Sequence, residues 1–334
     1  MTIKFMYGTD LHGKGINPST RTDDFPDTVD RKLMEYFEIG HQHEVDFFAF
    51  GGDLVDSPWT SPRYVIRLGK ILREHARGKT IYSIWGNHDE EGWNPNSVSG
   101  TSLGIFQEFS GCYQMLNREP LLYENAQGEK VKLSGVHAHP TMDRDVLDKE
   151  GDVIRHRSED YVIKDYDGTP HVHIVHGMLM PKPILEDIPH TLVSEMNHTK
   201  ATVTLTGHDH TGFAPIKTDY GYIYNPGAMT RVFASHTEMN RMPQVALITI
   251  EKGEATIQPI QLKSAQRGED VMDRTLLDEK KKKEALLKAA GENIQEVLST
   301  MNVQHVDLET VVTGFKDQIE EDVYNEVSRR LDIR

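Results

Sequence analysis

The feature that most constrains this sequence is a pattern that occurs five times. A short apolar run ends beside a glycine and a cluster of Asp, Asn or His. The runs cover residues 3–7, 47–50, 80–85, 172–175 and 202–205. Runs of this length that alternate with helical patterns predict an α/β fold. Because ligands bind at the carboxyl ends of strands in such sheets, we expect the five clusters to converge on one edge.

The spacing of apolar residues divides the rest of the chain. Residues 27–41 and 63–77 repeat apolar positions every three or four residues, which predicts helices. The pattern turns to β from residue 220 to 262, and the chain becomes highly charged and helical beyond Gly268. We therefore predict a catalytic core over 1–219, a β-rich closing or capping segment over 220–265, and a helical tail over 266–334. This tail is a candidate partner-binding arm.

Composition limits the compartment and the class of partner. The 334 residues include one cysteine, Cys112, which suits a reducing compartment. The N-terminus lacks the features of a secretory signal, and no run approaches the ~20 apolar residues of a membrane helix. We expect a cytoplasmic protein without a membrane span. The net charge of −15 argues against a broadly basic surface for nucleic acid.

The first three clusters offer mostly oxygen ligands. Asp10 and His12 stand two residues apart, so on an extended segment they point to the same side. Asp53 follows its strand directly and could bridge two ions with its two oxygens. Asn87 adds a neutral oxygen, which avoids the negative charge that would repel a phosphate. Each cluster alone is equally typical of turns.

The last two clusters supply imidazoles, from His176, His208 and His210. Mixed oxygen and nitrogen ligands suit Mn²⁺, Fe, Zn²⁺ or Ni²⁺ better than Ca²⁺. Two such ions about 3.5–4 Å apart polarise a phosphoryl oxygen and activate a water for in-line attack. The sequence therefore predicts a two-metal phosphoesterase site. His88 projects differently from Asn87, so we expect it to meet substrate. Asp56 has capping of the next helix as its structural alternative.

In combination, these motifs resemble those of the calcineurin-like metallophosphoesterase superfamily, over about residues 3–230. The motifs are Asp10-x-His12, Gly52-Asp53-x-x-Asp56, Gly86-Asn87-His88-Asp89, His176-Gly177 and Gly207-His208-x-His210. The resemblance implies a two-sheet sandwich flanked by helices. It also assigns one metal to Asp10, His12, Asp53 and His210, and the other to Asp53, Asn87, His176 and His208. His88 would protonate the leaving oxygen, with Asp56 orienting it.

Three stretches, residues 21–25, residues 44–47 together with 56–62, and residues 225–228, are similar to SbcD-type DNA repair exonucleases. This similarity implies a manganese-dependent DNA nuclease subunit of DNA repair and recombination. Its partner would be an SbcC-like ATPase bound through the helical tail. The glycines around Lys14 and the acidic charge favour instead a stand-alone phosphatase or small-nucleotide phosphodiesterase. A non-catalytic scaffold is a third alternative, which the complete ligand set opposes.

Some assignments stay open at this level. Lys14, Arg63 and Arg231 are candidate substrate contacts, although surface or turn roles explain them equally well. The pairs His137/His139 and His171/His173 look like metal ligands, but the predicted shell is complete without them, so we expect structural roles. The apolar stripes of the tail would serve partner docking or self-packing equally well. A homodimer is also left open.

Overall fold

The computed structural model describes residues 2–185, 187–275, 278–279, 281–283, 313, 316 and 321–330. The chain forms two compact units, residues 1–272 and 273–334. In the second unit, helix α8 spans Glu321–Arg330. Two apolar stripes are predicted in the tail, over residues 286–301 and 312–331. The first stripe and most positions of the second lie outside the described residues. Within the described part of the chain, no helix is long and apolar enough to cross a membrane.

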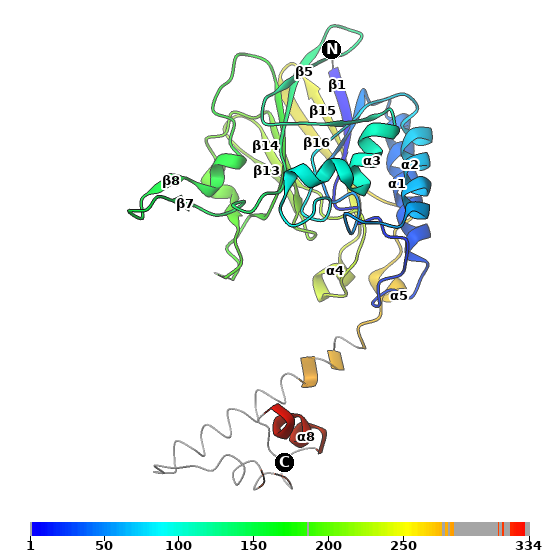
Figure 1. Ribbon diagram of the computed structural model, residues 1–334. Helices are drawn as coiled ribbons and strands as arrows, with labels where there is room; N and C mark the ends of the chain where they lie inside the picture. Colours follow the sequence, from blue (N-terminus) through cyan, green and yellow to red (C-terminus); the bar gives the residue numbers. More distant parts are fainter. Residues whose placement is uncertain are drawn as a thin grey trace. The chain divides into compact units, whose positions relative to one another are not determined.

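Two six-stranded mixed sheets form the first unit (Figure 1). The first sheet has the order β16-β15-β1-β2-β3-β4. Strands β1 to β4 run parallel, whereas β15 pairs antiparallel with β1 and β16 pairs antiparallel with β15. Their bounds are β1 Thr2–Gly8, β2 Phe47–Phe50, β3 Ile81–Ser83, β4 Tyr113–Met115, β15 Gln244–Glu251 and β16 Glu254–Gln261.

The second sheet has the order β13-β14-β12-β9-β6-β5, and its four central strands run parallel. Its bounds are β5 Leu121–Glu124, β6 Lys130–Val136, β9 His171–Gly177, β12 Val203–His208, β13 Phe213–Lys217 and β14 Tyr222–Asn225. The segment 220–265 supplies β14 to this sheet and β15 and β16 to the other. It therefore completes both layers of the sandwich and is not a separate cap over the site.

The remaining elements are helices and short ribbons around the sheets. The helices are α1 Phe25–Gln42, α2 Pro62–Ala76, α3 Ser102–Phe109, α4 His236–Asn240 and α5 Gly268–Val271, and the 3₁₀ turns are η1 Pro95–Gly100, η2 Arg157–Asp160 and η3 Val193–Met196. The ribbons pair β7 Val146–Leu147 with β8 Val153–Arg155, and β10 Leu179–Met180 with β11 Thr191–Leu192.

Alternation along the strands explains the layers. In β1, Phe5 and Tyr7 lie in the core between the two sheets, while Met6 lies in the core beneath the helices. Helices α1, α2 and α3 cover that second face (Figure 1). The Asp24 side chain caps α1 by accepting from the backbone N–H of Asp27. The predicted α/β sandwich flanked by helices is confirmed.

Candidate metal centre

The five predicted clusters converge at the carboxyl ends of β1, β2, β3, β9 and β12. Both sheets therefore contribute to the site. The loops bond directly to one another: the Asp10 N–H donates to the Gly52 carbonyl at 3.1 Å, and the His12 N–H donates to that of Asp53 at 3.0 Å. The His208 N–H donates to the Asp10 carboxylate at 3.1 Å, which joins the two sheets at the site.

Four of the predicted ligand residues have left-handed backbones. The φ angles are 52° for Asp10, 48° for His12, 51° for Asp53 and 77° for His208. Such angles are uncommon outside glycine and cost on the order of 1–3 kcal/mol each. They persist only where the surroundings hold them, and strain of this kind gathers at functional sites. No residue pattern in the sequence indicates it.

The first group of candidate ligands comprises Asp10, His12 and His210. The Nε2 atoms of His12 and His210 lie 2.9 Å apart, and Asp10 Oδ1 lies 3.9 Å and 3.7 Å from them. Burial lowers the pKa of His210 to about 2. The imidazole is therefore neutral near pH 7, the form that binds a metal.

The second group comprises Asp53, His176 and His208, with Asn87 beside them. His176 donates from Nδ1 to the Gly51 carbonyl at 2.8 Å, which leaves Nε2 facing Asp53 Oδ2 at 3.2 Å. Burial lowers the pKa of His208 to about 4, so it too is neutral. The absence of a side chain at Gly86 allows its backbone to lie against Asp53, because a Cβ there would collide with Asp53 Oδ1.

Two unpaired polar atoms test whether metals fit this site. Asn87 Oδ1 and His176 Nε2 are buried and form no hydrogen bond within the described part of the chain. Buried polar atoms without partners are rare and cost about 1–3 kcal/mol each. Asp53 lies between the groups, with Oδ2 also 3.8 Å from His12 Nε2. Burial alone would raise the pKa of Asp53, but His176 lowers it well below its usual range. These buried clusters are consistent with a binuclear metal site.

His88 stands at the edge of this centre, with its ring 4.8 Å from that of His12. Its backbone N–H donates to Asp53 Oδ1 at 2.8 Å, and its Nδ1 donates to the Asp56 carbonyl at 2.9 Å. A carbonyl can only accept, so Nδ1 carries a hydrogen and Nε2 is the atom left for a substrate oxygen. Asp56 therefore holds His88 through its main chain. Its carboxylate bonds Lys14 Nζ at 2.5 Å and lies 3.6 Å from His12 Nδ1.

The three candidate substrate contacts lie in different places. Lys14 is 33% exposed and is paired with Asp56 at the site. Arg63 is exposed at the start of α2, where it lines a separate cavity with Tyr64. Arg231 is 1% exposed, and its guanidinium donates to the carbonyls of Arg241 and Gln266. Arg231 therefore supports a buried loop and does not face the site.

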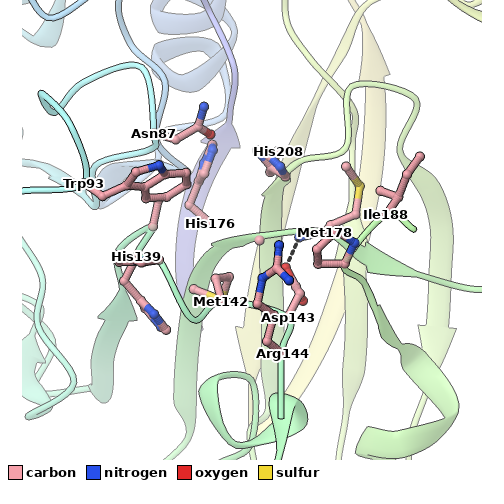
Figure 2. A pocket seen from close by; sticks show the side chains of 14 residues that line it. Asn87, Trp93, His139, Met142, Asp143, Arg144, His176, Met178, Ile188 and His208 are labelled. Atoms are coloured by element: carbon pink, nitrogen blue, oxygen red, sulfur yellow. Dashed lines mark hydrogen bonds between the residues drawn. The ribbon is translucent and has the colours of Figure 1, made fainter. Parts of the chain in front are cut away.

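A cavity of about 230 Å³ adjoins the second ligand group and brings in residues that the motifs did not indicate (Figure 2). Asn87, His176 and His208 form one wall, and Trp93 and Arg144 form part of the others. Neither Trp93 nor Arg144 follows a core strand. The two residues could therefore not be predicted from the pattern of polar clusters at strand ends.

The chain is similar to one known protein family and to several solved structures. The sequence profile described as calcineurin-like phosphoesterase matches residues 3–212. No curated protein matches the sequence. Among solved structures, TT1561 of Thermus thermophilus is similar at 12% identity and a TM-score of 0.44, covering 77% of this chain and 99% of its own.

Two further solved structures have the same TM-score of 0.44. A putative 5′-nucleotidase from Staphylococcus aureus is 14% identical, and the match covers 78% of this chain and 54% of that one. The calcineurin-like phosphoesterase YfkN from Bacillus subtilis is 12% identical, with 78% of this chain and 90% of its own covered.

Proposed function

This chain belongs to the calcineurin-like phosphoesterase family and is a metal-dependent phosphoesterase, and we propose that its substrate is the phosphodiester backbone of DNA. In this proposal the chain is a nuclease subunit of DNA repair and recombination in the cytoplasm. It works with an SbcC-like coiled-coil ATPase bound to the tail. The single cysteine supports a reducing compartment.

The observation that carries this proposal is where the SbcD-like stretches lie. The stretch 225–228 bonds to a ligand loop, because the Ala228 N–H donates to the His210 carbonyl at 3.0 Å. Just after it, Thr230 Oγ1 donates to the Leu11 carbonyl at 2.8 Å. Arg21, from another stretch, donates to the Arg231 carbonyl at 3.1 Å. One SbcD-like stretch therefore packs directly on a metal-ligand loop, and another bonds to the segment that follows it.

The chemistry needs two divalent ions, and we propose Mn²⁺ for both. Asp10, His12, Asp53 and His210 would hold one ion, and Asp53, Asn87, His176 and His208 the other. When bound, the ions would polarise the phosphoryl oxygens and lower the pKa of a bound water. In its imidazolium form His88 would give the Nε2 proton to the leaving sugar oxygen, while Nδ1–H stays donated to the Asp56 carbonyl.

The test is a nuclease assay on labelled single- and double-stranded DNA with Mn²⁺, alone and with the ATPase. The wild type is compared with His88→Ala and with Phe109→Ala, a control at the exposed end of α3. We expect cleavage by the wild type and the control, and strong loss in His88→Ala. Intact DNA under all these conditions, from a protein that hydrolyses p-nitrophenyl esters, contradicts the proposal.

A small-nucleotide phosphodiesterase is the second candidate. The form of the cavity favours it, because a cleft with apolar walls and a few convergent polar groups is the usual form of a small-ligand site. The charge of −15 also opposes unaided binding to duplex DNA. Turnover of cyclic-nucleotide esters with none of DNA would select this function.

A further inference from the structure

The cavity beside the second ligand group has mainly apolar walls. In Figure 2, Trp93 lies on one side and Ile188 on the other, with Met142 and Met178 between them. A cleft with apolar walls and a few convergent polar groups is the usual form of a small-ligand site. Here the polar groups include three predicted metal ligands. A ligand group in this cavity would therefore lie between apolar walls and close to the predicted metal ligands.

Trp93 is held in an unusual conformation. Its φ is 58°, in a turn closed by a bridge between Glu91 and Asn94. For a bulky residue this angle is a genuine outlier, and such strain costs about 1–3 kcal/mol. The indole is nevertheless 49% exposed, so the strain is not offset by burial of the ring in the core. An exposed ring held in this way beside a metal site is suited to stack on a flat ligand.

Arg144 is presented by a second strained turn. The preceding residue, Asp143, has a φ of 61° and is buried. Its carboxylate accepts from Tyr161 Oη at 2.6 Å, Thr191 Oγ1 at 2.7 Å and the Met178 N–H at 2.7 Å. Those bonds fix the turn and use the carboxylate fully. Arg144 is exposed, and within the described residues its guanidinium has no ion-pair partner.

We propose that this cavity is a subsite for one unpaired nucleobase of the substrate. The base stacks on Trp93 over the two methionines, and Arg144 pairs with a phosphate oxygen of the same nucleotide. The cavity measures about 230 Å³, and Trp93 is the one Trp, Tyr or Phe among its described lining residues, so it offers a stacking surface to a single base. This inference rests on the proposed phosphodiesterase function. Both a frayed DNA end and a free nucleotide ester contain an unpaired base beside a phosphate.

Two matched substrate pairs distinguish these sources, each assayed with Mn²⁺. The first pair is thymidine 5′-(p-nitrophenyl phosphate) and methyl p-nitrophenyl phosphate, which differ in the nucleoside. The second is a single-stranded oligonucleotide with a normal or an abasic terminal nucleotide. The wild type is compared with Trp93→Ala, Trp93→Phe, Arg144→Ala and the surface control Phe109→Ala, whose ring is 74% exposed.

We expect the wild type and Phe109→Ala to prefer the base-containing member by roughly 5- to 150-fold in kcat/KM, the range of base–aromatic stacking. Trp93→Ala should lose that preference and Trp93→Phe should keep part of it. Arg144→Ala should raise KM more than it lowers kcat. A preference confined to the small esters keeps the subsite and assigns it to a free nucleotide ester, not to a frayed DNA end. No preference in the wild type for either pair, or an equal preference in Trp93→Ala, overturns the subsite.

Discussion

Two histidine clusters in this protein share a sequence pattern and differ in what surrounds the rings. The metal centre contains His208-x-His210, and the second cluster contains His171-x-His173. In the second cluster, His171 Nε2 and His173 Nδ1 share Ser134 Oγ at 2.7 and 2.8 Å. His173 Nε2 donates to the Asp160 carbonyl at 2.8 Å. Burial lowers the pKa of both histidines to about 4.

The buried carboxylates at the two clusters also differ in whether a cation is paired with them. Asp160 is ion-paired with Arg118 and Arg155 and lies 3.0 Å from His139 Nε2. Asp53 has histidines as its neighbours, and no Lys or Arg of the described chain is paired with it. The comparison teaches that a His-x-His pattern alone does not mark a metal site. At the metal centre the rings lie beside other imidazoles and beside Asp10 and Asp53, neither of which is ion-paired with a Lys or Arg of the described chain. Where the protein supplies partners, the same pattern is structural.

The largest effect should come from Asp53→Asn. The change removes the charge that lies between both ligand groups, so both ions should bind weakly. Because each ion supplies several kcal/mol of charge stabilisation, we expect kcat/KM to fall roughly 10⁴-fold or more. Steady-state hydrolysis of bis-p-nitrophenyl phosphate with Mn²⁺ measures this. A loss below tenfold, in a variant with a wild-type circular dichroism spectrum, would mean that Asp53 is not a bridging ligand.

His88→Ala should have the next largest effect, and it separates substrate chemistry from metal binding. Loss of a general acid should lower kcat by roughly 10²–10⁴-fold for a sugar leaving group. The loss should be much smaller for p-nitrophenolate, which leaves without protonation. Bound metal, measured by elemental analysis, should be unchanged. Equal losses on both leaving groups would argue against an acid role.

Asp160→Asn tests the structural cluster and should leave metal binding and activity intact. Burial alone would raise the pKa of Asp160, but His139 and Arg155 lower it to about 2. The carboxylate therefore stabilises the fold above its unfolded pKa of about 3.9, and this contribution is lost as pH falls through about 2. We expect a loss of about 1–3 kcal/mol in the free energy of unfolding at pH 7, shrinking below about pH 4. Urea denaturation at pH 7 and pH 3 measures it, and an equal deficit at both values would contradict this origin.

Much of the fold and the site follows from local pattern. Alternating apolar residues and helical spacing indicate β1, α1, β2 and α2 in order, and the carboxyl-end rule brings Asp10, Asp53 and His176 together. The separation of segment 220–265 between two sheets could not be predicted, because strand pairing over long sequence distances is decided by tertiary packing. Tertiary packing also decides that Arg231 is buried, so the sequence could not indicate it.

The roles within the site were harder to predict than its members. Asp56 contacts His88 through a carbonyl, which every residue has, so the identity of its side chain could not reveal the contact. Trp93 and Arg144 depend on turns with positive φ at Trp93 and Asp143, residue types that carry little signal for that conformation. Both Trp93 and Arg144 border the cavity beside the metal centre.

Metal stoichiometry tests the central claim most directly. Metal-depleted protein is titrated with Mn²⁺ by isothermal calorimetry and the bound metal is checked by elemental analysis, for the wild type, His208→Ala and His173→Ala. We predict about two ions per chain for the wild type and for His173→Ala, and about one for His208→Ala. The assignment would be contradicted if His208→Ala still bound two ions and His173→Ala bound fewer than two. The ions would then lie at the cluster of His171 and His173.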